Sequence, residues 1–274
     1  SAEVGARPRR AGSEGAPRVR AFGADPPAGV VVSGVGAAEP GYFDGPVVGR
    51  GLSPAYPQGA SERAIAAGEP VLLDFTAVAS GYVADATRTA CCGPLHPALL
   101  RAFEVACAIQ DELARNLRPG VPCAELYAHA RAMAEQARLG EFFMGPPGDQ
   151  ARFVGHGVGL ELDELPVLAP GSRAVLEAGN AVAVEPKFVF PGAGAVGIEN
   201  TFAVTEDGGE KLTGKGDMLF LGPGNPNMIR AKGVYIADEE IRKVVDCCKA
   251  QAEPVYSDEI ERVASQAAAN GGKD

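Results

Sequence analysis

The sequence predicts an α+β fold in which helices pack on one face of a mostly antiparallel sheet. Three features indicate this class: a pair of apolar runs within residues 71–89, two helical patterns over residues 97–139, and further strand-like runs between residues 181 and 205. Strands grouped before and after the helices, rather than alternating with them, favour antiparallel pairing. The 274 residues allow one large domain or two small ones.

The N-terminal part of the chain combines a polar tail with the first predicted strand. Residues 1–16 are rich in Gly, Ala and Arg, and we expect them to form a disordered basic tail. The run Val30–Val32 predicts a strand. Residues 39–60 are dense in Gly and Pro and predict a long structured loop, which in a compact domain is usually functional.

The stretch Val71–Thr89 carries one acid in each of two predicted strands. A turn at Ala79–Gly81 would fold the second strand back on the first and bring Asp74 and Asp85 together. Carboxylates that converge in apolar surroundings repel each other unless a proton or a cation intervenes. These residues therefore leave two interpretations open, a metal site or a hairpin with solvated acids. Arg88 is expected to order the hairpin or its acids.

Helical spacing of apolar residues follows the hairpin. It predicts one helix from Pro97 to Leu117, which Arg118–Gly120 ends, and a second helix from Cys123 to Leu139. Downstream lie a Gly-interrupted apolar segment at 154–160, a run at 165–168, and two predicted strands at 181–190 and 198–205 that are joined by a Gly/Pro turn at 191–197.

Three further residues strengthen the metal hypothesis. His156 lies between glycines, which would let a ligand or a metal approach the backbone closely, and Glu185 and Glu199 lie on or beside apolar strands. Four carboxylates and one imidazole suit hard to borderline divalent ions, and bridging carboxylates can hold two of them. Two such ions can activate a water and stabilise a tetrahedral intermediate. His96, at a helix start, and His129, within a helix, are not expected to be ligands.

The motifs GYVADATRT, GHGVGLELDELP, VEPKFVFPG and GIENTFAVTEDG carry these residues in the order Asp, Asp, His, Glu, Glu. In this order they resemble the M24 metallopeptidase family, which comprises methionine and Xaa-Pro aminopeptidases, prolidase and creatinase. The resemblance implies the pita-bread α+β fold over residues 17–213. It also implies a dinuclear centre of manganese, cobalt, zinc or iron.

The resemblance also implies roles for individual residues. The metal ligands would be Asp74, Asp85, His156, Glu185 and Glu199, with Asp85 and Glu199 bridging two ions. Glu185 would act as general acid/base for the attacking water, so Glu185 and His156 are the predicted catalytic residues.

Two positions depart from the family pattern. Asp163 stands where the peptidases usually carry a second histidine, and Arg152 stands where proline-specific members often carry another. Both are predicted to bind substrate. An aspartate donates no proton at neutral pH unless its pKa is raised. Arg152 could hold a substrate carboxylate bidentately, or it could pair with Asp149 or Glu141.

The chain changes character in residues 214–274, which are similar to the C-terminal end of the motor domain of SpoIIIE/FtsK-type DNA translocases. They predict a short α/β fragment with a strand at Met218–Leu221 and a helix at Glu239–Cys248, capped by Asp238. A natural fusion and an artefactual chimera are both open. The residues Gly209–Gly216 match a P-loop only in part, because a Gly follows the Lys, and no nucleotide site is expected.

Composition limits the partners and the compartment. The net charge of −10 makes nucleic-acid binding an unlikely general function, and no apolar run is long enough to span a bilayer. Six cysteines without zinc or disulfide spacing, and no visible secretory signal, predict buried free thiols and a cytoplasmic location.

The leading functional prediction is a metal-dependent hydrolase of the aminopeptidase type that cleaves a small peptide, such as an Xaa-Pro one. The first alternative is a creatinase-like hydrolase of another C–N bond, or a metal-binding relative without turnover. A third is a DNA-translocase accessory that acts through the C-terminal segment. The sequence leaves open whether the domain forms a homodimer.

Overall fold

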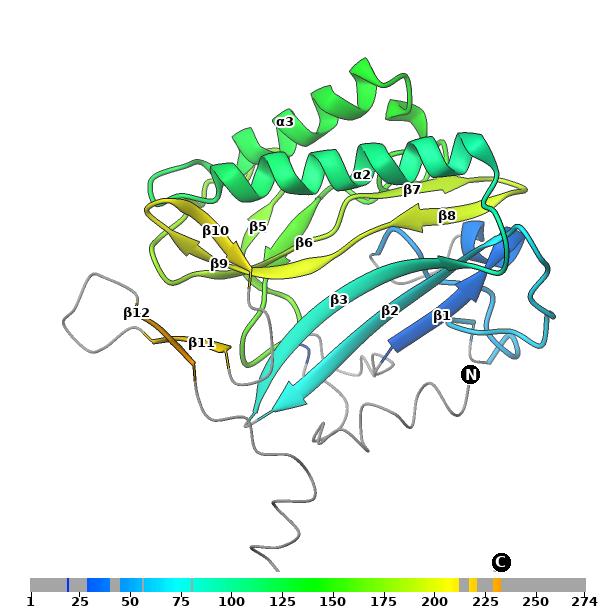
Figure 1. Cartoon of the computed structure of the whole chain (residues 1–274), viewed down its shortest axis with the longest axis horizontal. Helices are drawn as coiled ribbons and strands as arrows, with labels where there is room; N and C mark the ends of the chain where they lie inside the picture. Colours follow the sequence, from blue (N-terminus) through cyan, green and yellow to red (C-terminus); the bar gives the residue numbers. More distant parts are fainter. Residues whose placement is uncertain are drawn as a thin grey trace, which may run out of the picture. The chain divides into compact units, whose positions relative to one another are not determined.

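The structure is a computed structural model that describes residues 19, 29–39, 45–55, 57–79, 81–211, 217–220 and 229–232. One compact unit contains the elements from β1 to β10. Its first sheet is antiparallel and has the order β1 (Gly29–Ser33), β2 (Pro70–Ala79), β3 (Tyr82–Cys91). Figure 1 shows β2 and β3 as the long arms of one hairpin. The predicted strand at residues 30–32 and the predicted hairpin are therefore confirmed.

Two further antiparallel sheets complete this unit. The larger has the order β10-β9-β6-β4-β5, with bounds β4 Gly155–Gly157, β5 Glu164–Leu168, β6 Ala181–Val184, β9 Asn200–Thr205 and β10 Gly208–Lys211. The smaller pairs β7 (Lys187–Phe190) with β8 (Gly194–Gly197). The mostly antiparallel α+β class predicted from the sequence is confirmed.

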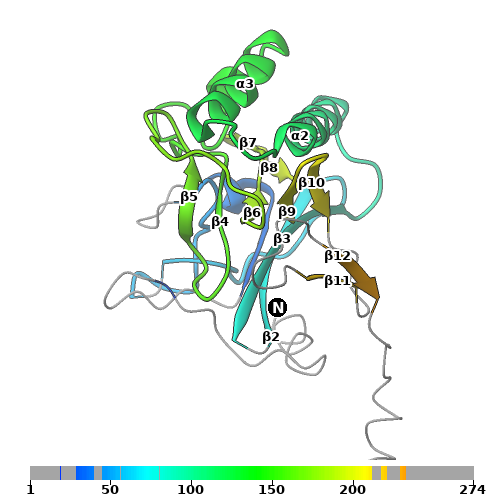
Figure 2. The ribbon, with the colours of Figure 1, turned by 90° about the vertical axis from the view of Figure 1, so that its left-hand side faces the viewer.

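Helices α2 (Pro97–Asn116) and α3 (Cys123–Gln136) lie together on one side of these sheets, as Figures 1 and 2 show. Two short 3-10 turns, η1 (Gly34–Ala38) and η2 (Gly140–Phe142), flank the sheets. The predicted second helix extended to Leu139, but α3 ends earlier, because Arg138 takes a left-handed backbone conformation with φ 61°. In the described part of the chain no helix is long and apolar enough to cross a membrane.

The main core lies between the helices and the sheets that contain β4 to β10. It contains the buried face of α2, including Ile109 and Leu113, and the buried side chains of Leu126, Val182 and Phe188. Apolar residues recur at helical spacing along α2, so a single stripe of that helix can pack on the strands. The packed helix holds the strands that follow it in place, including those that carry the predicted metal ligands.

The predicted strand at 181–190 is wrong, because it is two strands in different sheets. Pro186 has no N–H and interrupts the ladder, so β6 pairs with β9 whereas β7 pairs with β8. The predicted turn at 191–197 contains β8. The chain thus passes from the larger sheet to the smaller one at Glu185 and returns at Glu199. Both glutamates lie at crossings between sheets.

The cysteines are less buried than predicted. Cys91, Cys92, Cys107 and Cys123 are free, but only Cys123 is buried, and Cys92 is exposed. Cys247 and Cys248 lie outside the described residues.

The C-terminal prediction is only partly within the described residues. A strand was expected at residues 218–221, and β11 (Asp217–Phe220) pairs there with β12 (Ile229–Lys232). The predicted helix at 239–248 and the predicted tail at 1–16 lie outside the described residues.

An ion pair ties the loop before β2 to the end of β1. Arg63 Nη1 donates to Glu69 Oε1 at 2.7 Å and to Ser33 Oγ at 3.3 Å, and the Ala66 N–H donates to Glu69 Oε1 at 2.8 Å. The hydrogen bond from Arg63 is the main cause that lowers the pKa of Glu69 to about 2, against the opposing effect of burial.

This pair predicts a pH-dependent contribution to stability. A carboxyl whose pKa is lower in the folded protein stabilises it above its unfolded pKa of about 4.3, and this is lost as the pH falls toward the folded value. Glu69→Gln should therefore unfold at lower urea concentration than wild type at pH 7, with the difference narrowing between pH 4.5 and 3. Glu62→Gln, at an exposed neighbour, is the control. If the difference in unfolding urea concentration between wild type and Glu69→Gln stays constant over this pH range, the prediction is contradicted.

Candidate metal centre

The hairpin brings its two acids to one face of the first sheet. Asp74 lies opposite Thr87, and Asp85 lies opposite Thr76. Because residues two apart along a strand share a face, Asp74 and Asp85 are diagonal neighbours on that face. The Asp85 side chain is buried, whereas that of Asp74 is partly exposed. The predicted convergence of the two acids is confirmed, and the alternative of a hairpin with solvated acids is wrong.

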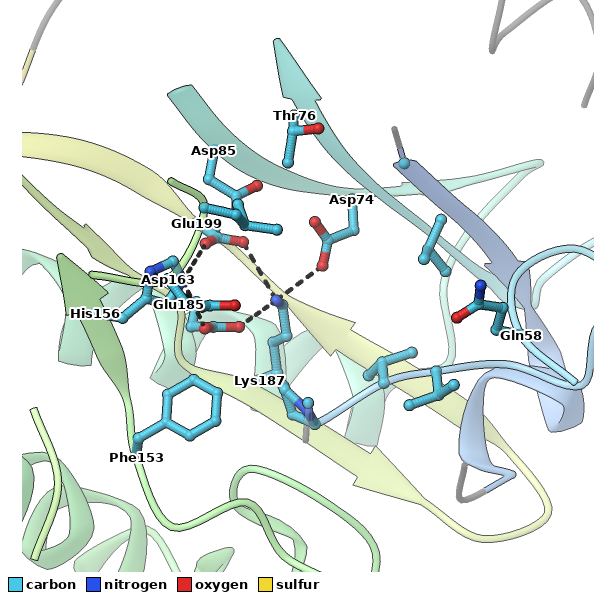
Figure 3. A pocket seen from close by; sticks show the side chains of 17 residues that line it. Gln58, Asp74, Thr76, Asp85, Phe153, His156, Asp163, Glu185, Lys187 and Glu199 are labelled. Atoms are coloured by element: carbon cyan, nitrogen blue, oxygen red, sulfur yellow. Dashed lines mark hydrogen bonds and ion pairs between the residues drawn. The ribbon is translucent and has the colours of Figure 1, made fainter. Parts of the chain in front are cut away.

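The two aspartates line a pocket with five other ionisable residues, and we call it the acidic pocket (Figure 3). Its ionisable residues are Asp74, Asp85, His156, Asp163, Glu185, Lys187 and Glu199. The pocket has a volume of about 100 Å³, and its lining also includes the apolar residues Val30, Val47, Val48, Phe153 and Leu162. The first sheet supplies one wall, and the strands and crossings of the other two sheets supply the opposite one.

His156 lies at the middle of β4, and its imidazole reaches both crossings. Its Nε2 lies 3.5 Å from Glu185 Oε1 and 4.0 Å from Glu199 Oε1. On the other side of the ring, Nδ1 lies 3.0 Å from the carbonyl oxygen of Gly157 and 3.5 Å from Asp163 Oδ1. A donor at Nδ1 would leave Nε2 free to act as a ligand.

The glycines beside His156 have a different role from the one predicted. A Cβ at Gly155 would lie 2.4 Å from the carbonyl oxygen of Ala183, and a Cβ at Gly157 would lie 2.5 Å from that of Leu165. These are contacts with the neighbouring strands β6 and β5. Glycine is therefore required for close strand packing around His156, and the interpretation that it admits a ligand is wrong.

Glu199 is held from several directions but has one free oxygen. Its Oε2 accepts a hydrogen bond from Thr87 Oγ1 at 2.7 Å, and its backbone N–H donates to the Thr87 carbonyl oxygen at 3.1 Å. Its Oε1 is buried and has no hydrogen-bond partner among the described residues. A buried charged oxygen without a partner is costly, so this atom indicates that the site is built to receive a cation.

Lys187 is the residue of the site that the sequence analysis missed. It is 1% exposed, and its Nζ lies 3.0 Å from Asp74 Oδ2, 2.5 Å from Glu185 Oε2 and 3.2 Å from Glu199 Oε2. Figure 3 shows the ammonium between the three carboxylates. The available signal was a lone Lys at the start of the apolar run Lys187–Phe190, where a buried charge requires partners.

Burial and mutual repulsion govern the ionisation of these groups. Burial is the largest influence on Glu199, and with the nearby carboxylates it raises the pKa of Glu199 to about 7, against the effect of Lys187. Burial, followed by the charges of Glu199 and Asp74, raises the pKa of Asp85 well above its usual value.

The two basic groups respond to the same acids. Burial lowers the pKa of Lys187, but the carboxylates of Asp74, Glu185 and Glu199 outweigh it, so that the net pKa is well above its usual value. Burial likewise opposes protonation of His156, and the neighbouring carboxylates outweigh it and raise its pKa.

The donor set fits one divalent ion. One ligand atom from each of Asp85, His156 and Glu199 lies within 4.8 Å of the others, and all three side chains are buried. Two carboxylates and an imidazole are common ligands of manganese, cobalt, zinc and iron. Glu185 Oε1, beside His156 Nε2, could complete this set. The place among Asp74, Glu185 and Glu199, in contrast, already holds the Lys187 ammonium.

A hydrogen-bond chain positions both crossings. Arg88 donates through Nη1 to the Glu199 carbonyl oxygen at 2.7 Å and through Nη2 to Asn200 Oδ1 at 2.8 Å, so it orders the segment of Glu199. Asn200 Nδ2 donates to Gln110 Oε1, and Gln110 Nε2 donates to the Val184 carbonyl oxygen at 2.8 Å. Through Gln110, helix α2 thereby connects Val184, which precedes Glu185, with Asn200, which follows Glu199.

The two predicted substrate-binding residues differ in position. Asp163 lines the acidic pocket beside His156, and its side chain is 52% exposed. Arg152 is exposed and is not among the side chains that line this pocket in the described part of the chain. Neither histidine outside the pocket approaches it: His96 caps the start of α2 through its Nδ1, and His129 is exposed.

Comparison with known proteins identifies the family of the chain. The profile of metallopeptidase family M24 matches residues 28–206. The chain is 31% identical over 179 residues to an Xaa-Pro dipeptidase of Pyrococcus furiosus, a match that covers 65% of this chain and 49% of the relative. The chain thus spans about half the length of the curated relatives it matches.

Solved structures show the same fold. A dipeptidase from Pyrococcus horikoshii OT3 has 31% identity and a TM-score of 0.56, over 68% of this chain and 46% of that one. An X-Pro aminopeptidase from Thermotoga maritima MSB8 has 25% identity and a TM-score of 0.60, over 75% of this chain and 49% of that one. The arrangement of sheets and helices is the pita-bread fold. The chain belongs to metallopeptidase family M24.

Proposed function

We propose that the chain is the catalytic part of a metal-dependent peptidase that hydrolyses small peptides of the Xaa-Pro type. The observation that carries this proposal is that five predicted ligands, from three strands and two crossings between sheets, converge in one pocket, with an oxygen of Glu199 that has no hydrogen-bond partner among the described residues. Relatives named Xaa-Pro dipeptidase support the substrate class.

In this proposal Asp85, His156 and Glu199 hold a divalent ion, and manganese, cobalt, zinc and iron all suit these donors. When bound, the ion supplies Lewis acidity that polarises a carbonyl and lowers the pKa of a water. The sequence resemblance implies two ions. The described geometry favours one ion, because the Lys187 ammonium occupies the position among Asp74, Glu185 and Glu199 where a second ion would bind.

Glu185 is the residue that moves the proton. Its Oε1 faces His156, and its Oε2 is held by Lys187 at 2.5 Å. A carboxylate fixed in this way can accept a proton from the attacking water and deliver it to the leaving amine. The hydrogen bond from Lys187 Nζ fixes the position of the Glu185 carboxylate for this transfer.

The lining supports a small substrate. A pocket volume of about 100 Å³ beside Phe153 and Leu162 suits one compact apolar side chain such as that of proline. The half-exposed carboxylate of Asp163 suits the ammonium of a dipeptide. Arg152 lies away from this lining, so the contact with a substrate carboxylate that we predicted for it requires a substrate that extends beyond the pocket.

The rival function is a relative that hydrolyses a different C–N bond or binds metal without turnover. Lys187 and Asp163 favour it, because both change the charges that a peptide would meet. A cytoplasmic location is proposed from the free cysteines, and assembly as a homodimer is a further prediction. The role of residues 214–274 stays a prediction based on their resemblance to DNA translocases.

The test is hydrolysis of a dipeptide panel by the purified chain after loading with Mn²⁺, Co²⁺ or Zn²⁺. We expect release of proline from Xaa-Pro dipeptides, less release of alanine from matched Xaa-Ala dipeptides, loss of activity with a chelator, and recovery when the metal is restored. A chain that binds metal but cleaves no peptide would favour the rival. A chain that binds no divalent ion would contradict both.

A further inference from the structure

The Lys187 ammonium lies where a second cation of the centre would lie. Its Nζ has one oxygen each of Asp74, Glu185 and Glu199 within 3.2 Å. Oxygens at such distances around a single point form a cage for a cation, and an ammonium fills it with hydrogen bonds in place of coordination bonds. The Lys187 side chain is 2% exposed, so the three carboxylates rather than water surround its ammonium.

Charge balance explains how a buried lysine is tolerated there. Besides the half-exposed Asp163, the pocket contains four carboxylates, from Asp74, Asp85, Glu185 and Glu199, in surroundings where unpaired charges are costly. One ammonium and one divalent ion together neutralise most of this charge. A second divalent ion beside the ammonium would place two cations in contact with the same three carboxylates, and their repulsion is strong in a poorly solvated site.

The two carboxylate oxygens of Glu199 have different surroundings. Its Oε2 is bound by Lys187 and Thr87, and its Oε1 faces His156 without a hydrogen-bond partner among the described residues. In the family pattern the matching glutamate bridges two ions. Here one oxygen already has a cation, the ammonium, and only the other is available to a metal.

We propose that Lys187 replaces the second metal ion of the centre, so that the chain binds a single divalent ion. The ion would lie at Asp85, His156 and Glu199, and Asp74 would be a partner of Lys187 rather than a metal ligand. This inference rests on the metal site of the proposed function and alters its stoichiometry.

The experiment measures bound metal in the whole chain and does not depend on activity. The protein is stripped with a chelator, titrated with Mn²⁺ by calorimetry, and its metal content is determined after desalting. The electron paramagnetic resonance spectrum of bound Mn²⁺ distinguishes an isolated ion from a spin-coupled pair. Wild type should bind one ion with an uncoupled spectrum.

Two variants complete the design. Lys187→Ala opens the cage and should bind two ions with a coupled spectrum. Lys211→Ala removes an exposed lysine of β10 and should behave as wild type, which controls for the loss of a positive charge. Metal-dependent thermal unfolding verifies that each variant is folded.

The outcomes separate this inference from the proposed function. Two tightly bound ions in wild type would overturn the inference and leave the proposed peptidase intact. A folded Lys187→Ala that still binds one ion would also overturn it, because another cause would then limit the site. Absence of peptidase activity in a wild type with one uncoupled ion would support the inference and count against the proposed function.

Discussion

Glu185→Gln is expected to lower kcat for hydrolysis of an Xaa-Pro dipeptide about 100- to 10,000-fold, which is the range of general acid–base catalysis. Glutamine has the shape of glutamate, so its carbonyl oxygen can still accept the hydrogen bond from Lys187 Nζ that Glu185 accepts at 2.5 Å. It cannot take up a proton from the attacking water. The fold should therefore be preserved while proton transfer is lost.

The measurement is steady-state kinetics with the metal-loaded proteins, together with thermal unfolding of each. Glu177→Gln makes the same chemical change at an exposed position outside the acidic pocket and should leave kcat unchanged. A folded, metal-loaded Glu185→Gln that keeps more than about a tenth of wild-type kcat would exclude Glu185 as the general acid/base, since even the low end of this catalytic range exceeds tenfold.

Lys187→Met is expected to destabilise the metal-free protein by about 3–5 kcal/mol, the typical cost of removing one partner from a buried ion pair. Methionine has a similar length, so little volume is lost. The three carboxylates around Nζ then face one another without a counter-ion. This is the largest stability change that we expect from a single side chain of the site.

Urea unfolding in the presence of a chelator measures this effect. Lys211→Met, at an exposed residue of β10, is the matched control and should change the free energy of unfolding by less than about 0.5 kcal/mol. Added Mn²⁺ should restore part of the stability of Lys187→Met, because a divalent ion binds only the folded arrangement of the acids. Equal effects of the two substitutions would show that Lys187 does not compensate the charge of the pocket.

Much of the fold could be predicted because its signals are local. The apolar residues of α2 recur every three or four positions, and the apolar runs of β2 and β3 are close neighbours along the chain. Both patterns can therefore be read within a short stretch of sequence. The point at which one apolar run divides into two strands could not be predicted in the same way. Nothing in the apolar character of residues 181–190 separates one strand from two, and the separation follows from which partners β6 and β7 find.

The candidate site was likewise predictable where its residues are close in sequence, and less so where they are distant. The sequence by itself determined the residue types and the chain order of the four acids and one imidazole, and with them the family. Asp74 and Asp85 could be placed together because a hairpin relates them directly. His156, Glu185 and Glu199 were added to them from their residue types, their neighbouring apolar strands and the family resemblance, since no local rule places them near the hairpin.

Only the tertiary structure decided which group compensates the negative charges of the carboxylates in the acidic pocket. Lys187 and Asp74 are 113 residues apart along the chain, and their contact at 3.0 Å depends on the packing of one sheet against another. A pattern of residue types records which side chains are polar or apolar, but not which distant groups share a buried space. For this reason the sequence predicted a pocket for two metal ions, whereas the folded chain places its own ammonium among three of the ligands.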